Sequence, residues 1–500
     1  MVMRSVKIKG DLLKRQRKHW ICYLVVFFCF LAVYALTAQR GVGWQDSGEF
    51  QYRALVGDYT WHSGIARAHP LYVALTQAGL ILFSGLNPFY AVNLVSGLGL
   101  AVALTLLAAV VARLTGQMRA AIASVCVLGL AHMAWWLGTI AEVYTWALAF
   151  VMAEVGCLIR YGENRKAGWL VLLFAVNGLH WSLHSTALLG LPVYAWVLSN
   201  AVIADVKGGK AWWQWLLLCA LCWTVGGGLV LWQALQVFCI TGKLATVIES
   251  VFFGNGYGPQ VLGVGGFSWA VWKANVALAG MSLLNPGWML ALRGLGMGCG
   301  PVRSWLLALT ALHGVFWIRY FVADQAMFVL PTLGLGAIWL GLGATACRKR
   351  TLWILLLAGV VAQVAIPPCL NRVAGKHVGR SRDLPFRDET RYWLIPWKQN
   401  ETSAQQFVDA INNQMKENDV LLADSTTAAS LMAIREFDKD ACAWRLVSPW
   451  TGEDIETLCR LAEQRNLLVV SPVKGYAHGV LLEKFEFDRE GVLWRARKRE

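Results

Sequence analysis

Long apolar segments, interrupted by short polar stretches, dominate the chain from about residue 20 to residue 370. A helix that crosses the ~30 Å hydrocarbon core of a bilayer needs ~20 such residues. The pattern predicts about eleven membrane-spanning helices, at 20–38, 88–112, 120–138, 140–159, 168–181, 184–201, 212–236, 269–290, 304–320, 325–346 and 351–368. The predicted fold is therefore a polytopic α-helical membrane protein, with a membrane module over 20–370.

The segment 70–86 is also apolar, but the distribution of basic residues argues against counting it as a span. If 70–86 does not cross, 19 Lys and Arg residues lie on the side of the N-terminus and only five lie in the outer loops. Cytoplasmic loops carry such an excess of Lys and Arg. We therefore expect 70–86 to be a re-entrant or juxtamembrane helix, and 1–19 to be a basic cytoplasmic segment with no evident cleavage site after the first apolar run. The first outer loop is then 39–87.

Residues 371–500 form a polar tail with 20 Lys/Arg and 20 Asp/Glu, so the net charge of +15 resides in the rest of the chain. Amphipathic and alternating patterns predict helices at 403–416, 425–436 and 453–464, and strands near 419–423, 444–448 and 466–471. We expect a small soluble α/β domain on the extracytoplasmic side. It contains neither a G-x-G-x-x-G nor a Walker motif, which leaves a nucleotide site unsupported.

Composition narrows the class of protein further. With 57% hydrophobic and 15% charged residues, the chain lies outside the range of water-soluble domains. No basic stripe interleaved with aromatic residues indicates nucleic-acid binding. The 12 cysteines show no CxxC spacing, and in the tail Cys442 and Cys459 would pair only in an oxidising compartment.

The first outer loop opens with the sequence GWQDSGEF, which carries two carboxylates. Asp46 and Glu49 are three residues apart, so a helical turn places them on one face. A carboxylate beside the bilayer is costly unless it has a partner or a function. One interpretation makes Asp46 a general base assisted by Glu49. The alternative is a solvated pair, with Asp46 as the N-cap of a juxtamembrane helix.

Other polar residues are predicted on the same outer face. His69, in the sequence RAHPL, would contact a phosphate or relay a proton, or would simply lie at the start of a helix that begins at Pro70. Arg67, two residues earlier, is a second candidate for binding the donor phosphate. Glu142 lies in AEVY, near aromatic residues typical of an interface, and would line the cavity or reach water. Glu154, deeper in the membrane, is expected to be structural and to approach Arg160.

Two further segments complete this face. His180 and His184 are four apart, a spacing that suits a metal, but they lie at a predicted turn without a following Glu, so lining a cavity is favoured. Arg319 would clamp a phosphate through its planar fork, whereas the alternative is a surface ion pair with Asp324. Carboxylates, histidines and an arginine beside the bilayer suit a substrate with a lipid tail and a charged head group.

The order of these motifs resembles the GT-C superfamily of membrane glycosyltransferases, most closely its protein O-mannosyltransferase-like branch. The matching sequences, over about 20–345, are WQDSGEF, AHPL, AEVY, GLHWSLH and DQAMFVLP. This chain has HPL where many members of the family have HPP. The tail also lacks the β-trefoil pattern of eukaryotic protein O-mannosyltransferases.

The resemblance implies a transferase that works in the lipid bilayer and takes a sugar from a polyprenyl-phosphate donor. The sugar would pass to a hydroxyl group of a glycan, lipid or protein on the non-cytoplasmic face. It implies Asp46 as base and Glu49 as its helper, with His69 near the donor phosphate. Glu142, His180, His184 and Asp324 would line the cavity, and Arg319 with the basic segment 372–382 would hold the phosphate. Transfer would invert the anomeric carbon and require no cofactor, although a divalent cation is compatible with it.

The bacterial inner membrane, with a periplasmic tail, is the expected location.

Two other classes of function fit the same pattern of spans. A transporter or flippase of a lipid-linked or anionic substrate would show internal repeats, and none is evident. A non-catalytic assembly factor would tolerate the loss of Asp46.

Overall fold

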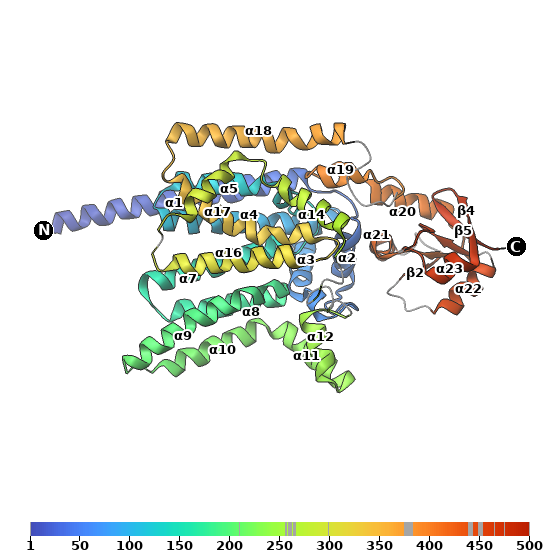
Figure 1. Ribbon diagram of the computed structural model, residues 1–500, viewed down its shortest axis with the longest axis horizontal. Helices are drawn as coiled ribbons and strands as arrows, with labels where there is room; N and C mark the ends of the chain where they lie inside the picture. The colour runs from blue at the N-terminus through green and yellow to red at the C-terminus, as the bar shows by residue number, and fades with distance from the viewer. Residues whose placement is uncertain are drawn as a thin grey trace.

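A computed structural model describes residues 2–209, 211–255, 258, 263, 267–298, 300–374, 384–438, 444–448, 454–464, 466–474 and 476–499. The molecule is elongated, with a bundle of long helices followed by the C-terminal α/β region at one end (Figure 1). Cys442 lies outside the described residues, as do residues 375–382 of the basic segment 372–382.

The helical part consists mainly of α-helices joined by short turns. Its elements are α1 (Val2–Thr37), α2 (Gln45–Val56), η1 (Ile65–Arg67), α3 (Pro70–Leu82), α4 (Pro88–Thr115), α5 (Met118–Gly129), α6 (His132–Leu137), α7 (Tyr144–Asn164), α8 (Gly168–Leu183), η2 (Ser185–Gly190), α9 (Leu191–Lys207), α10 (Trp212–Gly226), α11 (Gly228–Thr241), α12 (Leu244–Phe252), α14 (Trp269–Met281), η3 (Pro286–Trp288), α15 (Met289–Leu295), α16 (Val302–Arg319), η4 (Gln325–Val329), α17 (Leu330–Ala344) and α18 (Lys349–Val373).

Fewer helices than predicted have the length and hydropathy needed to cross a membrane. Among the described residues there are five, His19–Thr37, Pro88–Thr115, Ser185–Lys207, Gln325–Ala344 and Lys349–Val373, and a sixth if α10 and α11, which are bent by 69°, count as one span. The count of about eleven is therefore not confirmed. The other predicted windows contain shorter or interrupted helices, because a hydropathy window does not register a break such as the one between α5 and α6.

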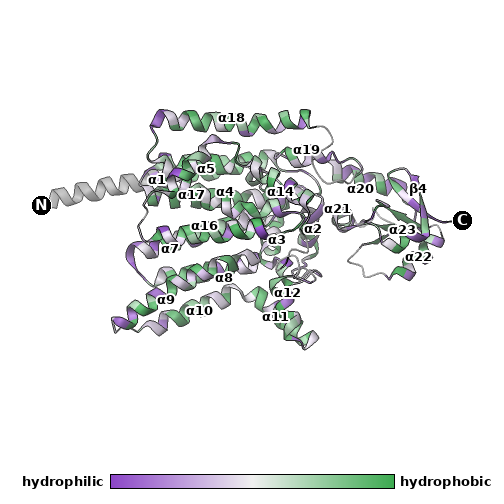
Figure 2. Cartoon of the chain, viewed as in Figure 1, coloured by the Kyte–Doolittle hydropathy of each residue, from purple (hydrophilic) through white to green (hydrophobic). Residues whose placement is uncertain are grey.

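The spans differ in what surrounds them. In the 325–344 span, 89% of the residues in the most apolar window are buried, so this span lies inside the bundle. The corresponding share is only 17% in the 19–37 span and 28% in the 349–373 span. Exposed apolar side chains such as Leu24 and Leu357 cover these outer helices, and Figure 2 shows the apolar character of the bundle. Apolar surface of this extent is stable only against lipid, so the chain is an integral membrane protein.

Two of the bundle helices approach each other through glycine. A Cβ at Gly178 of α8 would lie 2.3 Å from the Trp223 carbonyl oxygen of α10, and one at Gly226 would lie 2.7 Å from the Leu179 nitrogen. Small residues allow membrane helices to pack backbone against backbone in this way. The contact fixes the end of α8, from which the chain enters the outer face.

The first outer loop is folded rather than extended, because it contains α2, η1 and α3. With 13 residues, α3 is about 20 Å long at 1.5 Å per residue, which is shorter than the ~30 Å hydrocarbon core. The length of α3 agrees with its prediction as a helix that does not cross.

The C-terminal region combines helices with a five-stranded sheet in the order β2-β1-β3-β5-β4. Its elements are α19 (Glu389–Leu394), α20 (Ser403–Gln414), β1 (Val420–Leu422), α21 (Ser425–Phe437), β2 (Arg445–Val447), α22 (Ile455–Glu463), β3 (Leu467–Val469), α23 (Gly479–Lys484), β4 (Phe485–Glu490) and β5 (Leu493–Lys498). β1 pairs in parallel with β2 and β3, with Leu421 opposite Leu446 and Leu468, and β5 pairs antiparallel with β3 and β4.

Alternate residues of the short strands point to opposite faces of the sheet, and the two faces have different neighbours. Leu421 and Leu468 belong to the apolar core that continues into the membrane module. Val420 and Leu467 belong to a separate small core with Leu458 of α22. One face of the sheet is thus joined, through α20 and α21, to the helices of the first outer loop.

Candidate active site

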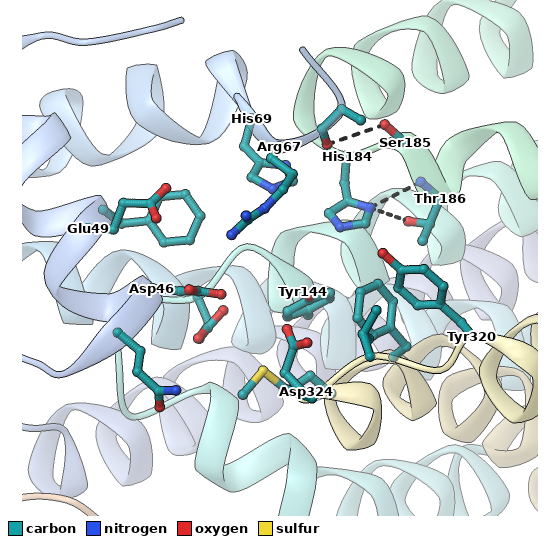
Figure 3. Close-up of a pocket in the computed structure, with 18 of the residues that line it drawn as sticks. Asp46, Glu49, Arg67, His69, Tyr144, His184, Ser185, Thr186, Tyr320 and Asp324 are labelled. Atoms are coloured by element: carbon teal, nitrogen blue, oxygen red, sulfur yellow. Dashed lines mark hydrogen bonds between the residues drawn. The ribbon is translucent and has the colours of Figure 1, made fainter. Parts of the chain in front are cut away.

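A cavity of about 550 Å³ lies where the first outer loop, the α8–η2 junction and the α16–η4 junction meet. Seven of the nine predicted site residues line it: Asp46, Glu49, Arg67, His69, Glu142, His184 and Asp324. Figure 3 shows the Asp46 and Asp324 carboxylates directed toward the same space, with Arg67 and His184 facing it from other sides.

Asp46 is held at the positive end of α2. Trp44 occupies the N-cap position in an extended conformation and makes no side-chain capping bond, and Asp46 is the second helical residue. The alternative in which Asp46 is the N-cap is therefore wrong, because the helix begins at Gln45, two residues earlier than that cap requires. A carboxylate in the first turn is stabilised by the helix dipole, and here it is presented to the cavity.

Glu49, one turn later, is paired inside the protein. Its Oε1 lies 3.3 Å from Nη1 of Arg53, whose side chain is fully buried. Arg53 also donates to the backbone carbonyl oxygens of Asp58 and Ala68, and these hydrogen bonds fix the position of its guanidinium group. Burial, assisted by the charge of Asp46, raises the pKa of Glu49 to about 8 in spite of Arg53. Glu49 is thus mainly protonated at neutral pH.

Glu142 reaches the cavity from the segment between α6 and α7. Its backbone is anchored by Ser96 of α4, whose Oγ accepts from the Glu142 N–H at 2.8 Å and lies 3.0 Å from the Glu142 carbonyl oxygen. The side chain is 2% exposed. Its Oε2 is buried and accepts no hydrogen bond from the described part of the protein. An acceptor in that state is available to a ligand.

The two histidines on this cavity are stacked. The ring centroids of His69 and His184 are 4.8 Å apart and the rings are inclined by 11°. His69 has a φ of 47°, a left-handed conformation that is strained for a residue with a side chain. Pro70 follows directly and begins α3. The His69 ring reaches the end of α8, where its Nδ1 lies 3.0 Å from the Leu183 carbonyl oxygen.

Arg67 is the one Arg or Lys among the described residues that line the cavity. It is the last residue of η1, a short helix held by a bond from the Ile65 N–H to the Ser250 hydroxyl at 3.0 Å. The described lining also contains several carboxyl groups, so Arg67 is the single cationic contact that it offers to an anionic ligand. The rest of the wall is largely aromatic and apolar, including Phe252, Phe253, Phe316, Phe321 and Phe328.

His180 does not line the cavity, and the prediction that it does is wrong. It is fully buried, and its Nδ1 lies 3.0 Å from Oε1 of Glu154. Glu154 also accepts from Asn177 at 2.9 Å and from the Tyr194 hydroxyl at 2.7 Å. The helix α8 continues to Leu183, so His180 lies one turn below the outer face. Glu154 is structural, as expected, but its partner is His180 rather than Arg160.

Arg319 is also absent from the described lining of the cavity. Its guanidinium lies 5.7 Å from the ring of Phe321 and donates to the Gly263 carbonyl oxygen at 3.2 Å. As the last residue of α16, it points away because the chain turns at Tyr320. Tyr320 and Phe321 reach the cavity in its place.

Several lining residues have no distinctive sequence signal. Tyr144 belongs to the AEVY motif, where the sequence indicates only an interfacial aromatic residue. Tyr392, of α19, and Trp136, of α6, reach the cavity from segments that carry no predicted site residue, and their rings are 5.8 Å apart. Only the folding of the C-terminal region onto the bundle brings them together.

A metal site is not evident within the described ranges, which contain no group of three or more His, Cys, Asp or Glu residues suitable as ligands. The i, i+4 pair His180 and His184 is divided between two environments: His180 binds Glu154, and Nδ1 of His184 binds Thr186. The spacing that suits a metal therefore serves two separate hydrogen-bonding sites.

No protein-family model matches the chain. Among solved structures, ArnT from Cupriavidus metallidurans bound to undecaprenyl phosphate aligns with a TM-score of 0.63 at 12% identity, over 96% of this chain and 97% of that one. Apo ArnT aligns with a TM-score of 0.57 at 13% identity, over 98% of both chains. The chain has the GT-C fold. The fold that the resemblance implies is thereby confirmed.

A sequence relative points in the same direction. The chain is 29% identical over 182 residues to protein O-mannosyl-transferase TMEM260 of Mus musculus, covering 35% of this chain. It spans only 25% of the length of that relative.

Proposed function

We propose that this chain is a membrane glycosyltransferase that moves a sugar from a polyprenyl-phosphate donor to a hydroxyl acceptor on the non-cytoplasmic side. The observation that carries the proposal is the Asp46 carboxylate facing the same cavity as Arg67. The aromatic wall and the lipid-facing helices suit a donor with a polyprenyl chain, and undecaprenyl phosphate is the molecule bound in the similar ArnT structure.

The reaction is a single displacement at the anomeric carbon. The acceptor oxygen attacks that carbon while the bond from the carbon to the phosphate oxygen breaks, and polyprenyl phosphate departs with the bonding electrons. The acceptor proton passes to Asp46. A hydroxyl is a weak nucleophile, so a placed carboxylate base accelerates the step. One displacement inverts the configuration, and the step requires no cofactor, although a divalent cation is compatible with it.

The ionisable groups that line the cavity have different roles in the proposed reaction. Glu49 is mainly protonated at neutral pH, so Asp46 is the carboxylate of this pair that accepts a proton. Arg67 binds the phosphate and stabilises the charge that develops on it as it leaves. Glu142 and Asp324 bind polar groups of the substrates. Arg319 does not line the cavity among the described residues, so the phosphate is assigned to Arg67.

The proposed setting is a bacterial inner membrane, with the basic N-terminal segment in the cytoplasm and the C-terminal α/β region in the periplasm. The excess of Lys and Arg in the loops on the N-terminal side supports this orientation. It places the cavity on the side where lipid-linked sugars are presented to acceptors outside the cell.

The test is sugar transfer in membranes supplied with labelled polyprenyl-phosphate sugars. We expect Asp46→Asn to lower transfer by about 10²–10⁴-fold, the usual contribution of a general base, while insertion and purification stay normal. Asp409→Asn is the matched control, because Asp409 is an exposed carboxylate of α20. Equal transfer by Asp46→Asn and the wild type contradicts the assignment of the base. Transfer from no donor favours a transporter.

A further inference from the structure

The stacked pair of His69 and His184 presents two nitrogens of different character to the cavity. In each ring Nδ1 is engaged by the protein, and both residues line the cavity, so Nε2 is the nitrogen left for a ligand. Figure 3 shows the His184 ring held by Thr186 on one side, with its other edge facing the cavity. What each Nε2 offers depends on which nitrogen carries the hydrogen.

For His184, a backbone N–H determines which ring nitrogen carries the hydrogen. The Thr186 N–H donates to Nδ1 of His184 at 3.0 Å, and the Thr186 hydroxyl lies 2.9 Å from the same atom. A nitrogen that accepts from a backbone N–H has no hydrogen of its own, so in the neutral ring the hydrogen is on Nε2. His184 therefore offers the cavity a hydrogen-bond donor.

His69 has the opposite arrangement. Its Nδ1 lies 3.0 Å from the Leu183 carbonyl oxygen, which accepts only, so Nδ1 carries the hydrogen. Burial, assisted by the neighbouring His184, lowers the pKa of His69 well below its usual range and keeps the ring neutral. Nε2 then has a free lone pair, and His69 offers the cavity an acceptor.

A donor and an acceptor on parallel rings match a hydroxyl group, which both donates and accepts. A phosphate dianion only accepts, so it would leave the His69 lone pair unsatisfied. The rings have apolar neighbours: Phe50 lies 5.8 Å from His69, and Tyr144 lies 5.3 Å from His184, centroid to centroid. Such walls exclude water and strengthen the two hydrogen bonds.

We propose that His69 and His184 together recognise one ring hydroxyl of the donor sugar and so determine which sugar is accepted. The hydroxyl donates to Nε2 of His69 and accepts from Nε2–H of His184. The inference rests on the proposed function. The donor sugar is the partner because Arg67, which binds the phosphate in that proposal, precedes His69 by two residues, so the attached sugar lies beside the pair.

The test uses the wild-type protein in membranes or detergent. Its kcat/KM is measured with short-chain polyprenyl-phosphate hexoses, and then with monodeoxy and monodeoxyfluoro analogues of the hexose it accepts best. We expect one deoxy position to lower kcat/KM by at least about 100-fold, because a site built for a hydroxyl rejects its absence. Fluorine at that position must fail as well, since it cannot donate to His69. Analogues that all stay within about threefold of the parent overturn the proposal.

Two variants separate recognition from a structural effect. His184→Phe and His69→Phe keep an aromatic ring but remove the nitrogen, so each should reduce the penalty at that one deoxy position and leave those at the other positions unchanged. A variant that lowers kcat/KM equally for the parent and every analogue overturns the proposal. If the wild type transfers from no donor, the proposed function fails, and the Kd of the same analogues, measured by calorimetry, decides recognition by the same criteria.

Discussion

Gly48 of α2 lies against the backbone of Ser430 in α21. A Cβ added at Gly48 would be 3.0 Å from the Ser430 nitrogen and 2.5 Å from the carbonyl oxygen of Gly43. The helix that carries Asp46 and Glu49 is therefore seated on the C-terminal region. Trp44, its N-cap residue, reinforces this seat: the Trp44 indole donates to the Ser403 hydroxyl at 2.8 Å and lies 5.2 Å from the ring of Phe407.

Gly48→Ala is expected to displace α2. Overpacking of this kind costs about 1–3 kcal/mol, and a shift of about 1 Å at a catalytic group lowers a rate by about 100-fold. Transfer by Gly48→Ala should fall accordingly, with a lower thermal midpoint. Gly41→Ala is the control, because its Cβ would meet only Gln405 at 3.8 Å. Similar rates for both variants would show that the seat of α2 does not govern transfer.

Arg67→Ala is expected to weaken use of the donor. Loss of the cationic contact should lower kcat/KM for the donor by at least about tenfold, since charge-assisted bonds to phosphate are strong. Arg319→Ala is the comparison, since Arg319 does not line the cavity, and its kcat/KM should stay near that of the wild type. Steady-state kinetics over donor concentration measure both. If Arg319→Ala lowers kcat/KM more than Arg67→Ala does, Arg319 rather than Arg67 binds the phosphate.

Glu154→Ala is expected to destabilise the protein. It leaves His180, Asn177 and Tyr194 without their common acceptor, and each unsatisfied buried group costs about 1–3 kcal/mol. Glu163→Ala, also on α7, removes only a half-exposed ion pair with Arg113, which contributes about 0–1 kcal/mol. Thermal unfolding in detergent compares them. If the two midpoints shift equally, the Glu154 network does not stabilise the bundle.

Glu49→Gln is expected to change how stability depends on pH. The pKa of Glu49 is raised from 4.5 to about 8 on folding, so between these values the folded state holds a proton that the unfolded state has lost. Stability from this group is present below pH 4.5 and is lost as pH rises toward 8. The thermal midpoint of Glu49→Gln should therefore fall less than that of the wild type between pH 5 and pH 8. Parallel curves would contradict the shift.

The sequence predicts the site better than it predicts the spans. The positive-inside rule places Asp46, His69, Glu142 and Asp324 on one face, and all four line the cavity. Hydropathy windows, in contrast, merge helices across breaks, and the predicted number of spans is not confirmed. The error at His180 has a related cause, because the extent of α8 decides whether a residue lies at a turn or one turn deeper.

Long-range contacts explain what the sequence does not reveal. Tyr392 reaches the cavity only because α19 packs against the bundle, where the Trp136 indole donates to the Tyr392 carbonyl oxygen at 3.1 Å. The tautomers of His69 and His184 depend on Leu183 and Thr186, and the folded backbone decides them. No local pattern of polar and apolar residues encodes such relationships.

The bond from Trp44 to Ser403 joins residues that are 359 positions apart. A ribosome synthesises the first outer loop early, so α2 has no supporting surface until α20 and α21 have been made. A chain interrupted before that point would carry Asp46 on an unsupported helix. The position of Asp46 therefore depends on residues that are synthesised much later than the first outer loop.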